Sequence, residues 1–223
     1  MKKLNSLLLT GCLMATGPVA ASVIVLDFEG AGNGAQLLNY YNGGTDSLGN
    51  SGTNYGIAFG SNALSLVDVD AGGGGNFANE PSPDTIMFFL TGTAILNYAP
   101  GFDTGFSFFY TSSTAATVNI YDGLNATGSL IASLNLSAQF NANSCNGDPS
   151  GSFCNWTAVG ASFSGIGKSI DFGGTVNQTG YDDITFGSAT AGGGGIAVPE
   201  PATLALLGLG FAGLGFMRRN RKV

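Results

Sequence analysis

The stretch "VNIYDGLNATGSLIASLNL" (Val118–Leu136) contains two apolar segments that flank a polar turn. In the first segment Val118 and Ile120 are two residues apart, so their side chains lie on one face of an extended chain. The residues between the two segments are rich in Gly, Asn and Asp, which is typical of the turn of a β-hairpin. The stretch therefore predicts two neighbouring antiparallel strands.

The same pattern of short strands and turns recurs along the chain. Phe106, Phe108 and Tyr110 share one face of another such segment. The expected strands are Val23–Phe28, Tyr55–Phe59, Ala63–Val69, Thr85–Leu90, Ala94–Tyr98, Gly105–Thr111, Thr117–Tyr121, Ser129–Leu136, Thr157–Phe163, Ser169–Phe172 and Asp183–Phe186. No long amphipathic pattern predicts a helix among them. Short strands at this spacing predict an all-β domain over residues 22–187, a jelly-roll-like antiparallel β-sandwich.

The first 21 residues have the features of a secretory signal peptide. Two lysines precede an apolar stretch, Leu7–Ala15, and small residues at the end of the segment fit cleavage after Ala21. The segment "LTGC" also matches a lipoprotein cleavage box, which would make Cys12 a lipidated N-terminus. Because the apolar segment before Cys12 is short for such a signal, we expect export by the Sec machinery and removal of residues 1–21.

The chain ends on an apolar run between two prolines and a basic cluster. Ala202–Met217 contains no charged residue, and a cytoplasmic basic cluster is expected directly after it, consisting of Arg218, Arg219, Arg221 and Lys222. As a helix this run would be ~24 Å long, which is short against a hydrocarbon core of ~30 Å. We expect one C-terminal transmembrane helix, separated from the sandwich by a Gly-rich linker at residues 188–198.

The net charge of the body differs from that of the whole chain, which is −7. Between residues 22 and 198, Lys168 is the one basic residue against thirteen acidic residues, which gives −12. A domain this acidic does not bind nucleic acid or an anionic membrane surface through charge. The chain also has no histidine, which excludes a Ser-His-Asp arrangement and a His-ligated zinc site.

The tail resembles the PEP-CTERM sorting signal. The resemblance is carried by "VPEP" at residues 198–201, the apolar run and "RRNRK" at the end. In that family, exported proteins of Gram-negative bacteria are thought to be processed by an exosortase, a membrane protease-transpeptidase, and the signal usually accompanies exopolysaccharide production. The resemblance implies that Pro199, Glu200 and Pro201 are the recognition site of a sorting segment at residues 199–223.

The same resemblance implies a partner and a location. The partner is an exosortase, the precursor is a single-pass protein of the inner membrane, and the mature form lies at the cell surface or in the extracellular matrix. A permanent C-terminal anchor is the alternative. The body is similar, at Leu26–Gly30 ("LDFEG") and Gly180–Gly187 ("GYDDITFG"), to jelly-roll domains that often precede this signal and that resemble carbohydrate-binding modules. This resemblance implies a polysaccharide partner but does not name the ligand.

Two cysteines, Cys145 and Cys154, flank an eight-residue polar loop. Because disulfides persist in exported proteins, we expect the two cysteines to form one. A pair of free thiols is the alternative.

The acidic residues of the body include candidate calcium ligands. Asp27 and Glu29 are two apart in a predicted strand, so they are expected to project to the same face. Asp182 and Asp183 begin the last predicted strand, and the first and last strands of a jelly roll commonly lie close together. Oxygen ligands suit Ca²⁺, so we expect these four carboxylates to hold a structural calcium ion. Asp68 and Asp70 form a second same-face pair.

The position of Asp182 leaves two interpretations open. The alternation predicts that Asp182 shares the core-facing side of its strand with Ile184 and Phe186, where a carboxylate needs a partner. The partner is either the calcium ion or backbone N–H groups in the turn after Gly180.

Tyr40 and Tyr41 lie in a polar stretch and are predicted to be exposed rings that stack on sugars. We interpret the chain as a non-enzymatic surface or matrix protein associated with exopolysaccharide. One alternative is a structural or adhesive protein that has no small-molecule ligand. The other is a polysaccharide-modifying enzyme that uses two carboxylates.

Overall fold

The computed structural model describes residues 23–140, 145 and 151–193. The predicted signal peptide, transmembrane helix, sorting motif and basic cluster all lie outside these residues. Within them, no helix is long and apolar enough to cross a membrane. The regular secondary structure of the described residues is almost wholly strand, and every strand predicted from the sequence has a counterpart.

The first sheet has six strands, and β11 (Thr179–Phe186) lies at its centre. One edge of β11 pairs with β6 (Phe106–Ser112), which pairs in turn with β9 (Thr157–Ala161). The other edge pairs with β4 (Thr85–Phe88) and, further along, with β1 (Ile24–Leu26). The strand β3 (Leu64–Val67) pairs with β4. The first and last strands are therefore neighbours, as expected.

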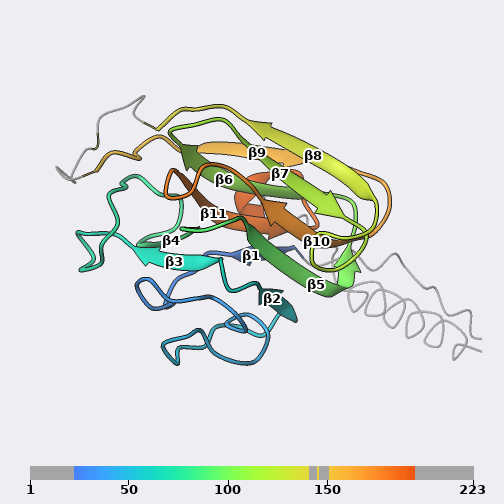
Figure 1. The fold of residues 1–223 in the computed structure, drawn as a ribbon, viewed down its shortest axis with the longest axis horizontal. Coiled ribbons are helices and arrows are strands. Elements are labelled where there is room, and N and C mark those ends of the chain that lie inside the picture. Colours follow the sequence, from blue (N-terminus) through green and yellow to red (C-terminus); the bar gives the residue numbers. More distant parts are fainter. Residues whose placement is uncertain (1–22, 141–144, 146–150, 194–223) are drawn as a thin grey trace, which may run out of the picture. The chain divides into compact units, whose positions relative to one another are not determined.

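The second sheet has five strands in the order β2-β5-β10-β7-β8. Their bounds are Ile57–Phe59, Ala94–Phe102, Gly167–Phe172, Ala116–Tyr121 and Leu130–Leu136, respectively. All the pairs in both sheets are antiparallel. Figure 1 shows the two sheets overlapping as layers. The prediction of an all-β, jelly-roll-like antiparallel sandwich is confirmed.

Aromatic rings fill the space between the sheets. Phe106, Phe108 and Tyr110 lie on the inner face of β6, as the alternation predicts, and all three are buried. Phe172 from β10 contacts Phe106 and Phe108 across the core, with ring centroids 6.2 and 6.0 Å apart. Such offset and edge-on contacts between buried rings contribute beyond the area that they bury.

A β-bulge interrupts β11 at Asp183. The register against β6 shifts between Asp182 and Thr185, and Asp183 has a positive φ of 47°. The bulge changes which side chains face the core. Tyr181 takes the core position and contacts the ring of Phe108 at 5.6 Å, whereas Asp182 points to the other face of the sheet. The prediction that Asp182 shares a face with Ile184 is therefore wrong, because a bulge adds one residue to a two-residue period.

Residues 188–193, the first part of the predicted linker, run along the outside of the six-stranded sheet. Ser107 Oγ donates a hydrogen bond to Ser188 O at 2.9 Å, and Gly192 N donates to Thr185 Oγ1 at 3.1 Å. A Cβ atom at Gly160 would lie 2.0 Å from Ala189 O, so only glycine leaves room for the chain here. This part of the linker is therefore attached to the sandwich and ends in a short 3₁₀ turn, η1 (Ala191–Gly193).

Candidate functional site

The loop that follows β1 borders an open hollow of about 690 Å³. Its lining is mostly polar and consists of Asp27, Glu29, Gly30, Tyr40, Tyr41, Gly49, Asn50, Ser51, Gly52, Thr53 and Tyr55. Four of these, namely Asp27, Glu29, Tyr40 and Tyr41, are candidate site residues that the sequence analysis named for two separate reasons. The structure brings them together at one place, and we refer to it below as the tyrosine hollow.

Asp27 and Glu29 reach the tyrosine hollow from a turn. The strand β1 ends at Leu26, and Phe28 takes a positive φ of 61° that breaks the strand between the two acids. The prediction that Asp27 and Glu29 share a strand face is therefore wrong. The hydroxyl of Tyr41 holds this turn, because it accepts from Phe28 N at 2.7 Å and donates to Asp27 Oδ1 at 3.3 Å.

Tyr40 and Tyr41 are buried, with 3% of each side chain exposed. Their rings contact each other edge to face at 4.8 Å, and Tyr40 OH donates to Glu29 O at 2.7 Å. The prediction of two exposed rings for sugar stacking is wrong, because the polar stretch around them folds over the rings. Burial, together with the charge of Asp27, raises the pKa of both hydroxyls, so both remain protonated donors at neutral pH.

The aromatic surface that reaches the hollow belongs to Tyr55. Its ring stacks on that of Tyr41, with centroids 6.0 Å apart and planes inclined by 28°. Tyr55 is half-buried, so part of the ring is open to solvent. From the sequence it was only the first residue of a predicted strand. A ring fixed on one side by another ring and open on the other is suited to stacking against an apolar ligand face.

Asp46, which was not among the candidate residues predicted from the sequence, organises the opposite wall of the hollow. Its buried carboxylate accepts from Gly32 N, Leu48 N, Asn50 N and Asn50 Nδ2, all between 2.8 and 3.0 Å. Burial opposes ionisation, but these hydrogen bonds outweigh it and lower the pKa of Asp46. The available signal was the segment "TDSLGN", since an aspartate two residues before a turn often bonds its backbone.

Glu29 ties the floor of the hollow to the loop before β4. Its Oε1 atom accepts from Asp84 N at 2.9 Å and from Thr85 N at 2.8 Å. Burial raises the pKa of Asp183, and the negative charges of Asp27 and Glu29 raise it further. The three carboxylates are therefore close enough to interact electrostatically. The structure thus brings Asp27, Glu29 and Asp183 into one neighbourhood, as expected from the pairing of the first and last strands.

Asp182 has its own buried partners and does not line the hollow. Its carboxylate accepts from Ser82 N at 2.9 Å, from Ser82 Oγ at 2.7 Å and from Asp183 N at 2.7 Å. Burial raises its pKa to about 8. Hydrogen bonds to backbone and hydroxyl groups therefore satisfy this carboxylate. They come from the Ser82 loop and the bulge, rather than from the turn after Gly180.

Within residues 23–140, 145 and 151–193, no group of three or more His, Cys, Asp or Glu side chains is arranged to hold a metal ion. A second acidic hollow of about 210 Å³ is lined by Asp68, Asp70, Glu80 and Asp84, among others. Burial, followed by the charges of the three aspartates, raises the pKa of Glu80 to about 7. Calcium binding by Asp27, Glu29, Asp182 and Asp183 stays a prediction.

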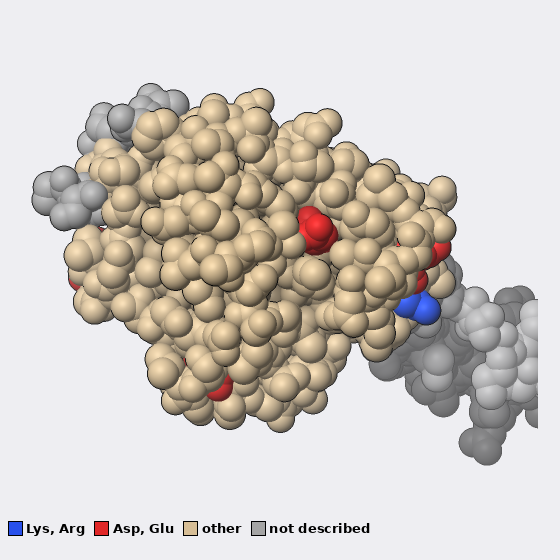
Figure 2. All heavy atoms as spheres, in the orientation of Figure 1, with Lys and Arg blue, Asp and Glu red and all other residues tan. Residues whose placement is uncertain are grey.

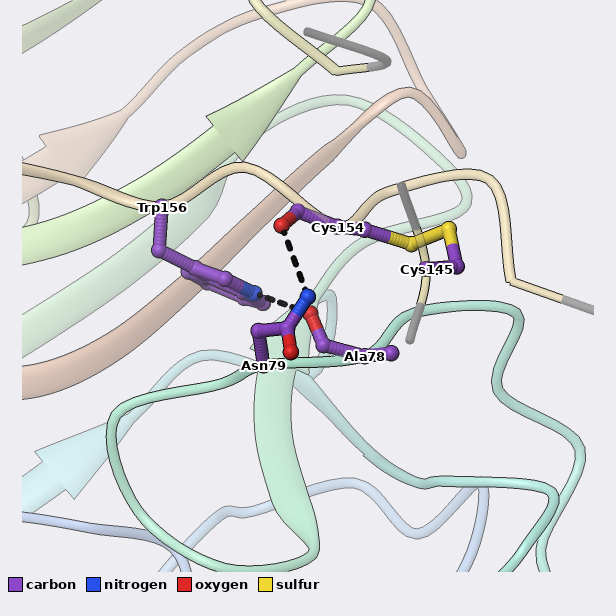
Figure 3. Close-up of a disulfide and its surroundings, with 5 residues drawn as sticks. All are labelled: Ala78, Asn79, Cys145, Cys154 and Trp156. Atoms are coloured by element: carbon purple, nitrogen blue, oxygen red, sulfur yellow. Dashed lines mark hydrogen bonds between the residues drawn. A yellow bond between two sulfur atoms is a disulfide. The ribbon is translucent and has the colours of Figure 1, made fainter. Parts of the chain in front are cut away.

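The predicted disulfide between Cys145 and Cys154 is present, with a Cα–Cα distance of 5.2 Å (Figure 3). Two side chains fasten the backbone beside it to the segment before β4. Asn79 Nδ2 donates to Cys154 O at 3.2 Å, and Trp156 Nε1 donates to Ala78 O at 3.1 Å. The bridge therefore lies beside two hydrogen bonds that hold the segment around Cys154 and Trp156 against Ala78 and Asn79, and Trp156 has a structural hydrogen bond.

Residues 197–222 match the family model described as the PEP-CTERM protein-sorting motif. The tail is a sorting motif. A motif of this kind marks an exported protein for processing by an exosortase at the membrane. It covers the C-terminal end of the chain only, and comparison with curated proteins finds no match.

This chain is similar, at low sequence identity, to several solved structures. A Bacillus subtilis glycoside hydrolase family 43 arabinoxylan arabinofuranohydrolase is 16% identical over 58% of this chain, with a TM-score of 0.38. This chain covers 25% of that protein. A carbohydrate-binding module of Cellvibrio mixtus lichenase 5A is 12% identical over 56% of this chain and 86% of its own, with a TM-score of 0.33. The K3 adhesin domain of Porphyromonas gingivalis Lys-gingipain is 13% identical over 74% of this chain and 91% of its own, with a TM-score of 0.32.

Proposed function

We propose that the protein is a non-enzymatic component of the cell surface or extracellular matrix of a Gram-negative bacterium, and that it associates with exopolysaccharide. An exosortase processes it at the sorting motif after export. The sorting motif supports export and processing, and the tyrosine hollow supports the association with exopolysaccharide. The observation that carries the second part is the half-buried ring of Tyr55, stacked on Tyr41 beside Asn50.

The chemistry of the tyrosine hollow suits a neutral, polyhydroxylated ligand. Asn50, Ser51 and Thr53 are exposed on its rim and offer both donors and acceptors. The buried Asp46 fixes Asn50 through its backbone and its amide, so this side chain is held in place before a ligand arrives. A mostly preformed hollow with one aromatic surface and a few placed polar groups is typical of small-molecule sites.

The non-enzymatic role is supported by the state of the two carboxylates at the tyrosine hollow and of Asp182. Glu29 is engaged by two backbone N–H groups, and Asp27 by the Tyr41 hydroxyl and Glu29 N. Asp182, whose raised pKa would suit a general acid, is fully buried behind Ser82. Glycoside hydrolysis needs two carboxyl groups facing each other across a substrate. These groups instead hold the loops of the domain.

A binding experiment tests the proposal. The full chain, purified in detergent, is titrated with soluble oligosaccharides from neutral glucans, mannans and galactans. Binding is expected for at least one class, and Tyr55→Ala and Asn50→Ala should each weaken it about tenfold. Tyr121→Ala, which removes a half-buried tyrosine outside the hollow, is the matched control and should leave affinity unchanged. Release of new reducing ends from any of these oligosaccharides would contradict the non-enzymatic role.

A further inference from the structure

A third hollow, of about 440 Å³, lies on the solvent-facing side of the five-stranded sheet. Its polar lining residues are Thr117 and Asn119 from β7, Asn135 from β8 and Asp171 from β10. Small residues, among them Ala115 and Gly173, leave its floor open. No aromatic residue is among the described residues that line it, so a ligand there has no ring to stack on.

The strand register places these polar groups side by side. Asn119 stands directly opposite Asp171 on one neighbouring strand and Ser133 on the other. Thr117 stands opposite Asn135. Directly opposed residues of an antiparallel pair have Cβ atoms about 5 Å apart. The register therefore places Asn119 next to Asp171 and Thr117 next to Asn135, and all four residues line one hollow.

The two asparagines have their oxygen atoms engaged and their nitrogen atoms available. Ser133 Oγ donates to Asn119 Oδ1 at 2.8 Å, and Thr117 Oγ1 donates to Asn135 Oδ1 at 3.4 Å. Among the described residues, neither Nδ2 group has an acceptor. These amides can therefore donate to ligand hydroxyl groups.

Asp171 has an incompletely compensated carboxylate. Its Oδ1 atom is shielded from solvent and accepts no hydrogen bond within the described part of the chain, while the residue as a whole is half-buried at the hollow. A carboxylate that has lost water on one side without gaining a donor attracts a cation more strongly than a fully hydrated one. A cation in the hollow can bind to the part of the Asp171 carboxylate that stays exposed.

The charge of the whole body favours the same kind of ligand. Lys168 is the only basic residue between residues 22 and 198, against thirteen acidic residues. In the face that Figure 2 shows, acidic groups are scattered among uncharged residues, with one basic group at the side. Such a field attracts polycations and repels polyanions such as uronic-acid polymers.

We propose that the hollow at Asp171 is a separate sugar site that binds a unit carrying a free ammonium group, so that the polysaccharide partner contains free amino sugars in addition to the neutral units that suit the tyrosine hollow. This proposal rests on the proposed function and adds a charged unit to its ligand. The ammonium group pairs with the Asp171 carboxylate, and neighbouring hydroxyl groups accept from Asn119 and Asn135. An ionic hydrogen bond at a half-buried site contributes more than a neutral one.

The test is a calorimetric titration of the full chain with short glucosamine oligomers and with N-acetylglucosamine oligomers of equal length. The two probes differ in the charge of the amine, and the glucosamine oligomer is expected to bind more tightly. Asp171→Asn should weaken its binding about tenfold, since one charged hydrogen bond is lost. Asp103→Asn, which changes the net charge equally at an exposed position outside the hollow, should have no such effect.

A second pair of variants tests the location. Asn119→Lys puts a competing ammonium group directly opposite Asp171 on the neighbouring strand and should abolish binding, whereas Ser129→Lys adds the same charge at an exposed position outside the hollow. If the variant inside the hollow and its control outside the hollow lost the same affinity for the glucosamine oligomer, in either pair, binding would reflect general attraction by the acidic body and the proposal would be overturned. Equal binding of both probes would overturn it too. Loss of neutral-sugar binding in Tyr55→Ala, with amine binding intact, separates this site from the tyrosine hollow.

Discussion

Ser82 binds the carboxylate of Asp182, which lies 100 residues further along the chain. Its backbone N–H donates to Oδ2 and its hydroxyl lies 2.7 Å from Oδ1. The same hydroxyl lies 3.0 Å from Asp27 O, directly after β1. A single serine thus connects the last strand, at its bulge, with the end of the first strand. The tyrosine hollow begins at this connection.

Replacing Ser82 with alanine should destabilise the sandwich. Asp182 is fully buried, and among the described residues the change leaves its Oδ1 atom with the Asp183 N–H as its one donor. The change also removes the hydroxyl that contacts Asp27 O. We expect a loss of about 1–3 kcal/mol in the free energy of unfolding, measured by urea denaturation. Ser61→Ala, at an exposed position, is the control. Equal stability of the Ser82 variant and the parent would contradict the role of this contact.

The stability of the protein should fall as the pH rises from about 4 to 8. The ordinary pKa of Asp182 is 3.8, and burial raises it to about 8 in the folded protein. Between these values the folded state holds a proton that the unfolded state releases, so deprotonation favours unfolding. The Ser82 hydroxyl has one hydrogen but lies within hydrogen-bond distance of both Asp182 Oδ1 and Asp27 O. When Asp182 is protonated, its O–H can donate to Ser82 Oγ, and the Ser82 hydrogen is then available to Asp27 O.

Asp182→Asn removes this contribution, so its melting temperature should depend less on pH over this range than that of the parent. Glu80, whose pKa is raised to about 7, acts in the same direction, and Glu80→Gln reports its share. Melting curves at half-unit steps from pH 4.5 to pH 8.5 provide the comparison. A pH dependence that is identical in the Asp182 variant and the parent would show that this carboxylate is ionised throughout.

The strands and the fold class could be predicted because they follow from local patterns. Alternation and turn residues identified β6, β7 and β8 within a residue or two. The wrong predictions of where β1 ends and of which residues of β11 face the core each depend on a single backbone angle. The positive φ of Phe28 ended β1 early, and the positive φ of Asp183 changed the phase of β11. An aromatic or acidic residue with a positive φ is uncommon and has no clear sequence signature.

Some members of the candidate site were predictable, but its geometry was not. The sequence could nominate Tyr41 and Asp27 from their residue types, yet the hydroxyl-to-carboxylate contact between them depends on how a long loop folds back on β1. Tyr55 and Asp46 were missed for the same reason. Asp171 was missed because it lies in a strand whose partners, β7 and β5, are far away in sequence. Such contacts follow from topology, which local patterns do not specify.

Breaking the Cys145–Cys154 bridge should destabilise the protein, because it frees the segment that Trp156 and Asn79 hold by hydrogen bonds. The cysteines are nine residues apart, and closing a loop of this size stabilises the folded state by about 2–3 kcal/mol. The double variant with serine at both positions should lose this amount in urea denaturation. In the parent, both thiols should resist labelling until a reductant is added. Rapid labelling of the untreated native protein would contradict the bridge in the exported form.

Calcium should raise the melting temperature if Asp27, Glu29 and Asp183 share an ion. A ligand specific to the folded state adds about 2.7 kcal/mol at 100 times its Kd. The full chain is compared in a chelator and in millimolar Ca²⁺, with Asp27→Asn as the variant that should lose the response. Asp103→Asn is a control at an exposed site away from this group. Equal melting temperatures in chelator and calcium would remove the calcium site.

The sorting motif predicts two forms of the protein. A precursor should lie in the inner membrane with Arg218, Arg219, Arg221 and Lys222 in the cytoplasm, and a mature form that lacks Ala202–Met217 should lie outside. Neutral residues at the four basic positions remove the charge that retains the C-terminus. We expect this variant to release unprocessed protein.

Glu200→Ala separates recognition from membrane insertion. The change leaves the apolar run and the basic cluster intact, so insertion should persist, while processing at Pro199-Glu200-Pro201 should fail and precursor should accumulate. Thr203→Ala, a similar change three residues further along, is the control and should be processed normally. Mass spectrometry of the inner-membrane and surface fractions provides the measurement. An intact Ala202–Val223 segment on protein at the surface would mean that the tail is a permanent anchor, since processing removes it.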